Sequence, residues 1–276
     1  SSAILQRLGS TGRLIAIDRD PQAIAAAPQR LLNDSRFELI RGEIAKLEEY
    51  LGERDLTGQV DGLLLDLGVS SPQLDEAHRG FSFRRDGPLD MRMDPEHGIS
   101  AAEWLENVDE ADLRRTLKQL GEETMAKRIA AAIVRARADN PIRRTTDLAR
   151  IVENAVPAKM RHQRRHPATK TFQAIRIAVN GELEQLEQAL SQALRALGKG
   201  GRLCVIAFHS LEDRIVKRFM RDHSLEPEQY RGMPNIPPEF LPLLKLITRA
   251  VVASDEEIAA NVRARSARLR VAERSA

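Results

Sequence analysis

Two carboxylates lie where apolar segments end, which makes them well suited to ligand chemistry. Asp18 follows the apolar segment 13–17, and Asp66 lies near the end of a second one at 60–67, directly before a Gly-Val-Ser-Ser-Pro turn. Ligands of open α/β sheets bind at the carboxyl ends of the strands. A lone carboxylate is costly to bury, so Asp66 either binds a ligand or caps its own turn.

Asp18 has two uses that do not exclude each other. An acidic residue at the end of the second strand of a nucleotide-binding α/β half accepts hydrogen bonds from ribose hydroxyls. The sequence Asp-Arg-Asp-Pro also opens a helix well, with Asp20 as the N-cap and Pro21 at the first helical position. Its position alone does not separate the two uses.

Strand and helix patterns alternate around these carboxylates. Short apolar segments predict strands at 13–17, 37–40, 60–67 and 202–208. Apolar residues at helical spacing predict helices at 21–32, 45–56 and 171–197. This alternation predicts a parallel, doubly wound α/β sheet. Ile44 follows the second of these strands and is therefore expected near the same sheet edge as Asp18.

The start of the chain departs from this pattern. A nucleotide-binding sheet begins with a strand and a glycine-rich loop before its first helix, whereas residues 1–8 already show the pattern of that helix. Omission of a central strand would leave two unpaired strand edges. We therefore expect the first strand and its loop to lie upstream of Ser1 in a longer natural protein.

The middle of the chain predicts an inserted helical domain. Residues 75–95 carry turn residues and mixed charge without a period, and loops of this length inside a domain are usually functional or disordered. Helical patterns follow, beginning with a capping box at 100–103. We predict an α/β domain from residues 1–73 and 166–276, interrupted by a helical insertion at 74–165 whose role is either scaffold or substrate recognition.

Two basic segments are candidates for phosphate contact. Residues 159–170 hold five Lys or Arg and no acid, among them Arg164, Arg165 and Lys170, and a second basic segment includes Arg263 and Arg265. Arginine suits bidentate phosphate contact. Such a segment is either a phosphate-binding patch or a solvated surface.

Composition narrows the class of protein. The 276 residues are 42% hydrophobic and 30% charged with a net charge of +3, as expected of a globular protein without a membrane-spanning segment. The single cysteine, Cys204, excludes an internal disulfide and indicates a reducing, cytoplasmic environment. The six histidines and this cysteine lack metal-ligand spacing, so no metal site is assigned.

Six blocks together resemble the bacterial small-subunit (16S) ribosomal RNA cytosine-N4 methyltransferases. They cover nearly the whole chain and occupy residues 66–75, 79–83, 86–94, 166–180, 208–217 and 263–274. The resemblance implies a Rossmann-like, S-adenosylmethionine-dependent methyltransferase that makes N4-methylcytidine in the decoding region. Its partner would be small-subunit ribosomal RNA or the 30S subunit, while the oligomeric state is left open.

The resemblance also implies site residues. Asp18 would hold the adenosine ribose, Ile44 would pack near the adenine, and Asp66 and Gln73 would complete the cofactor pocket. The family's Gly-Gly-His-Ser loop would lie at or before Ser1.

Methyl transfer to N4 needs an amine aligned with the methyl group and an acceptor for its protons. Ser70 and Ser71, after the strand at 60–67, and His209, after the strand at 202–208, are the candidates for this catalytic role. Phe81 or Phe83 is a candidate for stacking on the base.

Two alternatives compete with this interpretation. A nicotinamide-dependent dehydrogenase would use Asp18 in the same way, to bind a ribose. The glycine-rich loop that would distinguish a dehydrogenase from a methyltransferase is not in the sequence given. A non-catalytic, RNA-binding ribosome assembly factor would need only the basic segments. Titration of the protein with S-adenosylmethionine and with nicotinamide cofactors would separate the methyltransferase, the dehydrogenase and the assembly factor.

Overall fold

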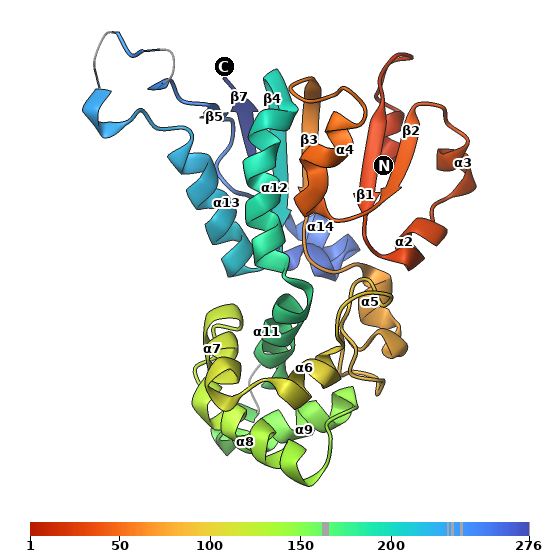
Figure 1. Ribbon diagram of the computed structural model, residues 1–276, viewed down its shortest axis with the longest axis vertical. Helices are drawn as coiled ribbons and strands as arrows, with labels where there is room; N and C mark the ends of the chain where they lie inside the picture. Colours follow the sequence, from red (N-terminus) through yellow and green to blue (C-terminus); the bar gives the residue numbers. More distant parts are fainter. Residues whose placement is uncertain (162–165, 231, 233–234, 238–239, 276) are drawn as a thin grey trace. The chain divides into compact units, whose positions relative to one another are not determined.

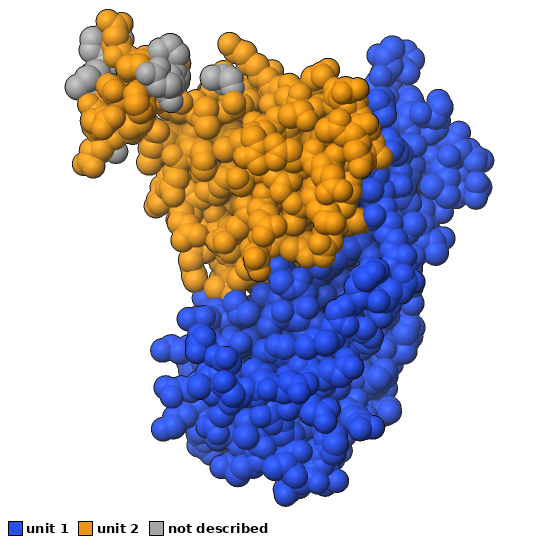
Figure 2. All heavy atoms as spheres, in the orientation of Figure 1, with its two compact units in different colours: residues 1–41, 69–182 blue, residues 42–68, 183–276 orange. Residues whose placement is uncertain are grey.

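The computed structural model describes residues 1–161, 166–230, 232, 235–237 and 240–275 (Figure 1). It has two compact units, each assembled from two segments of the chain (Figure 2). The first unit contains residues 1–41 and 69–182, and the second contains residues 42–68 and 183–276. The predicted division at 74–165 remains a prediction.

The first unit begins with a short parallel sheet. Strands β1 (Leu14–Asp18) and β2 (Phe37–Arg41) pair in a register that places Asp18 opposite Arg41 at the carboxyl end. The helix predicted at 21–32 is wrong in its length, because Pro28 separates two short helices. The helices of this region are α1 (Ser2–Leu5), α2 (Pro21–Ala25) and α3 (Gln29–Leu32).

Helices form the rest of the first unit, as the apolar spacing predicts. The bounds are α5 (Ser71–Asp75), η2 (Ala77–Arg79), α6 (Ala101–Asn107), α7 (Glu110–Leu120), α8 (Ala126–Asp139), α9 (Thr145–Ala155), α10 (Ala158–Arg161) and α11 (Ala168–Asn180). Leu89 and Met91, from the loop before α6, are fully buried in the helical core. The loop without a period is therefore packed against the helices by its own apolar residues.

The second unit is built on a mixed sheet in the order β3-β4-β7-β5, with β6 also paired to β7. Its strands are β3 (Val60–Asp66), β4 (Leu197–Ala207), β5 (Leu244–Leu246), β6 (Val251–Val252) and β7 (Arg268–Arg274). β3 and β4 are parallel, whereas β7 is antiparallel to β4, β5 and β6. Together with the parallel β1–β2 pair, this gives the Rossmann-like α/β class that was predicted.

Helices α12 (Glu182–Ala196) and α13 (Ser210–Asp222) cover one face of this sheet, as Figure 1 shows. Leu186 and Leu190 of α12 pack with Leu203 and Val205 of β4 in one buried cluster. The remaining short elements are η1 (Ile44–Lys46), α4 (Leu47–Gly52), η3 (Glu228–Tyr230), α14 (Asp255–Ala260) and η5 (Val262–Ser266). No helix in the described ranges combines the length and apolar character needed to cross a membrane.

The single helix predicted at 171–197 is wrong, because it ends at Asn180 and restarts at Glu182. Gly181 between them has a left-handed backbone, with φ of 59°. Such a conformation costs little for glycine and more for a residue with a Cβ. The Arg176 guanidinium donates two 2.8 Å bonds to Glu182 across the break.

We predict that Gly181→Ala destabilises the protein by about 1 kcal/mol through its left-handed backbone alone, because no atom lies within 4 Å of the added Cβ. Gly52→Ala is the matched control, since its Cβ also meets open space at an ordinary backbone angle. The control should be neutral or stabilising. Urea unfolding of both variants measures the difference, and equal midpoints would contradict the strain argument.

Candidate active site

Asp18 lies at the carboxyl end of β1 with its side chain exposed. One carboxylate oxygen, Oδ1, accepts a 2.9 Å bond from the backbone N–H of Asp20. Partial desolvation by the surrounding protein raises the pKa of Asp18 above its ordinary value, with the Asp20 N–H opposing this effect. The carboxylate is therefore oriented and still able to accept hydrogen bonds from a ligand.

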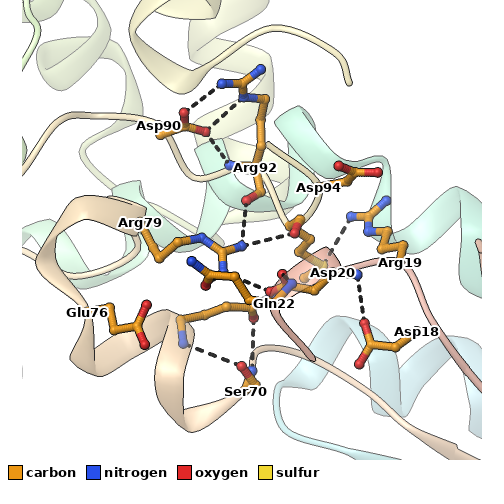
Figure 3. A network of polar contacts seen from close by, with 12 residues as sticks. Asp18, Arg19, Asp20, Gln22, Ser70, Glu76, Arg79, Asp90, Arg92 and Asp94 are labelled. Atoms are coloured by element: carbon orange, nitrogen blue, oxygen red, sulfur yellow. Dashed lines mark hydrogen bonds and ion pairs between the residues drawn. The ribbon is translucent and has the colours of Figure 1, made fainter. Parts of the chain in front are cut away.

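Asp20, two residues further on, is buried and fully engaged (Figure 3). Its Oδ1 accepts from the backbone N–H of Gln22 and caps α2. Its Oδ2 accepts from Gln73 Nε2 and from Arg79 Nη1, each at 2.8 Å. The side chain thus works as the predicted N-cap and also as an acceptor for two distant residues.

The positive charge of Arg79 compensates the buried negative charge of Asp20. The Arg79 side chain is itself only 4% exposed. Nη1 also donates to Gln22 Oε1 at 2.5 Å, and Nη2 donates to the carbonyls of Arg92 (3.2 Å) and Met93 (2.9 Å). Neither the Asp20–Arg79 ion pair nor any of these hydrogen bonds was predicted from the sequence. A single sequence gives no signal that pairs residues 59 positions apart.

Further bonds attach the 79–96 loop to the same region. Asn180 accepts from the backbone N–H of Met93 at 2.8 Å and donates to the Met91 carbonyl at 2.7 Å. Arg41, at the end of β2, forms ion pairs with Asp94 (3.2 Å) and Glu96 (2.5 Å). The loop is therefore anchored at the carboxyl ends of β1 and β2.

Gln73 and Ser70 form a capping box at the start of α5. The Ser70 N–H donates to Gln73 Oε1 at 2.9 Å, and Ser70 Oγ accepts from the Gln73 N–H at 3.4 Å. The Gln73 side chain is buried, and both ends of its amide are hydrogen-bonded: Oε1 accepts from Ser70 and Nε2 donates to Asp20. Ser71 is exposed, and its hydroxyl forms no hydrogen bond to any described residue.

In the second unit, Asp66 lies at the end of β3 and is exposed. Desolvation by the surrounding protein raises the pKa of its carboxyl group. No described group donates a hydrogen bond to this carboxylate. Asp66 therefore does not cap its own turn among the described residues, and ligand binding is the alternative that stays open. Ile44, at the start of η1, packs against the core of the same unit.

His209 is the N-cap of α13, and its ring makes local contacts. Nδ1 accepts from the Glu212 N–H at 3.4 Å, and Nε2 lies 3.1 Å from Glu212 Oε1. The second Glu212 oxygen accepts from the backbone N–H groups of Phe208 and His209. These contacts give His209 a capping role, and a catalytic role for it stays a prediction.

The basic residues that were predicted to contact RNA differ in their surroundings. Lys170 in α11 is exposed and donates through Nζ to the Glu122 carbonyl at 2.9 Å. Arg263 and Arg265 are exposed on η5 of the second unit. Arg164 and Arg165 lie outside the described residues. The assignment of these residues to RNA stays a prediction.

Asp18 in the first unit and Asp66 in the second each present an exposed carboxylate at the end of a parallel strand, where ligand hydroxyl or ammonium groups can donate to it. The mixed α/β architecture is that of the Rossmann-like methyltransferases. The model of the MraW methylase family matches residues 1–275, so the chain belongs to this family. It is the family of the 16S ribosomal RNA cytosine-N4 methyltransferase, and its cofactor is S-adenosylmethionine. The predicted resemblance is confirmed, and a nicotinamide-dependent dehydrogenase is excluded.

We predict that Arg79→Ala destabilises the protein by about 3–5 kcal/mol, because it leaves the Asp20 carboxylate buried and unpaired. Arg85→Ala is the control, since Arg85 is exposed and in the same loop. It should change stability by less than about 0.5 kcal/mol. Denaturant unfolding tests both variants, and a small loss for Arg79→Ala would show that water replaces the ion pair.

We predict that Asp18→Ala weakens S-adenosylmethionine binding by about 1.5–3 kcal/mol, the scale of hydrogen bonds to a charged group. The pKa of Asp18 is raised above 3.8, so the wild-type affinity should be full above that raised pKa and decline as the pH falls through it. The variant should lose this component of the pH dependence. Calorimetry across the acidic range measures both effects, with Asp61→Ala as an exposed control. Unchanged affinity in folded Asp18→Ala would refute the assignment.

Proposed function

We propose that this methyltransferase transfers the methyl group of S-adenosylmethionine to the exocyclic N4 amine of a cytidine in the decoding region of 16S ribosomal RNA. The observation that carries the proposal is the match of the MraW methylase family over residues 1–275. The residue blocks that resemble the cytosine-N4 enzymes support the same target.

The cofactor, when bound, supplies an electrophilic methyl group. Asp18 and Asp66 would hold the cofactor by accepting its hydrogen-bond donors, and Ile44 would pack beside the adenine. The remaining task for the chain is to align the amine and to accept a hydrogen bond from it, because the N4 lone pair is delocalised into the ring.

Ser71 is the catalytic candidate whose polar atom is both exposed and without a described hydrogen-bond partner, whereas the unpartnered Nε2 of His209 is buried. Ser70 Oγ and His209 Nδ1 already accept bonds from backbone N–H groups. The Ser71 hydroxyl is exposed at the first position of α5, with no acceptor or donor among the described residues. We propose that this hydroxyl accepts a hydrogen bond from the N4 amine.

The RNA partner is supported by the basic character of two segments. Arg263 and Arg265 are exposed on η5. Lys170 is exposed on α11, in the same basic segment of the sequence, 159–170. Guanidinium and ammonium groups bind phosphates without reading sequence. A substrate in the 30S subunit places the enzyme in the cytoplasm.

The experiment that tests this function is methylation of 30S subunits that lack N4-methylcytidine, with labelled S-adenosylmethionine. We predict one labelled nucleoside, N4-methylcytidine, on mass spectrometry of the digested RNA. Label on another nucleoside would refute the target. Specific 30S binding without any methyl transfer would instead support a non-catalytic assembly factor.

We predict that Ser71→Ala lowers kcat about tenfold with little change in cofactor affinity, the effect of one lost hydrogen bond of about 1.4 kcal/mol. Ser35→Ala, at an exposed turn residue, is the control. Single-turnover methylation of 30S subunits gives the rate for each variant. An unchanged rate for Ser71→Ala would remove this residue from the mechanism.

A further inference from the structure

Three aromatic rings of the first unit form a series from the helical core to the solvent. Phe172 of α11 is buried, Phe83 of the 79–96 loop is half-buried, and His166 is exposed. The centroids of Phe172 and Phe83 are 4.8 Å apart with an edge-to-face tilt of 68°. Those of Phe83 and His166 are 4.6 Å apart with a tilt of 36°. Phe81, the other aromatic residue considered for base stacking, is buried beneath the Arg79 guanidinium.

His166 is oriented by two hydrogen bonds and by contact with Phe83. Its Nδ1 accepts a 3.2 Å bond from the backbone N–H of Ala168, and its carbonyl accepts a 3.0 Å bond from Thr169. Phe83 contacts the ring on its protein side, while the residue as a whole is open to solvent. An exposed aromatic ring held in one orientation loses little conformational freedom when a flat ligand stacks on it.

Three arginines belong to the segment that follows Phe83 or to the turn that hydrogen-bonds to this segment. Thr145 Oγ1 donates to the Arg85 carbonyl, the Thr145 N–H donates to the Gly87 carbonyl, and the Leu89 N–H donates to the Arg143 carbonyl. These bonds place the segment that follows Phe83 against the turn before α9. Arg84, Arg85 and Arg143 therefore project from adjoining backbone.

The charges of this region are predominantly positive and unpaired. Arg84, Arg85 and Arg143 are all exposed, and none of the three forms an ion pair with a described residue. The nearby acid, Asp86, is already bound by Arg144 and by the Thr146 hydroxyl. Unpaired guanidinium groups are well suited to phosphate.

We propose that His166, supported by Phe83, is a stacking platform for one unpaired nucleobase of the RNA substrate, and that Arg84, Arg85 and Arg143 bind the phosphates beside it. This inference rests on the proposed RNA substrate and names a contact for it. The ligand is single-stranded RNA, because bases inside a duplex are already stacked on their neighbours.

The stacking is tested with a uridine decaribonucleotide that carries one central 2-aminopurine, whose fluorescence is quenched by stacking. His166→Leu removes the ring and His166→Phe keeps an aromatic ring, so the two variants separate stacking from packing. We expect about tenfold weaker binding and less quenching for H166L, with both restored in H166F. His97→Ala is the control, since His97 is an exposed histidine of the same unit that contacts Asp94. Equal binding and quenching for H166L and H166F would overturn the platform.

The phosphate contacts are tested by the salt dependence of binding to the same oligonucleotide. Arg85→Gln and Arg143→Gln should each reduce the slope of log affinity against log salt by about 0.7, the value for one contact to a single strand. Arg150→Gln is the matched control, because Arg150 is an exposed arginine already within 3.6 Å of Asp147. Unchanged slopes for R85Q and R143Q would overturn the arginine contacts.

Failure of this inference is distinguishable from failure of the proposed function. Wild-type protein that forms N4-methylcytidine on 30S subunits, together with equal oligonucleotide binding by H166L and H166F, would refute the platform alone. Wild-type protein that forms no N4-methylcytidine, together with the expected difference between H166L and H166F, would refute the target and keep the platform.

Discussion

The buried ion pair of Asp20 and Arg79 is the interaction on which the organisation of the first unit depends. Removing two charges from water costs several kcal/mol, which is recovered only when every lone pair and proton finds a partner. Here the carboxylate accepts three bonds and the guanidinium also reaches two loop carbonyls and Gln22. The pair thereby joins the end of β1, the start of α5 and the loop after η2 in one network (Figure 3).

This network also orients Asp18, the residue that the family resemblance implies for the cofactor ribose. The backbone N–H of Asp20 orients the Asp18 carboxylate, so the same tripeptide caps a helix, anchors the loop and presents a ligand acceptor. Gln73, which the family resemblance implies for the cofactor pocket, has its amide held by Ser70 and Asp20. Its carbonyl oxygen and one of its N–H groups are thus engaged within the protein. The site is positioned by buried polar bonds more than by apolar packing.

Much of the fold could be predicted from the sequence, because local chemistry specifies it. The apolar segments ending in Asp18 and Asp66 are strands, and Asp20 and Ser100 cap helices as their positions indicate. Two predicted helices were wrong for local reasons. Pro28 lacks the N–H that would continue one helix, and Gly181 adopts a left-handed backbone that apolar periodicity does not reveal.

The six residue blocks between Asp66 and Arg274 by themselves indicated the family and its cofactor, because several of them are long and unusual in their residue types. Only the tertiary structure decided what those residues do. Arg79 is a buried ion-pair partner, the rings of Phe83 and His166 are in contact, and the Ser71 hydroxyl has no partner among the described residues. The physical reason is that a side chain's role depends on which donors, acceptors and rings lie within a few ångströms of it. Those neighbours come from distant parts of the chain, and folding alone brings them together.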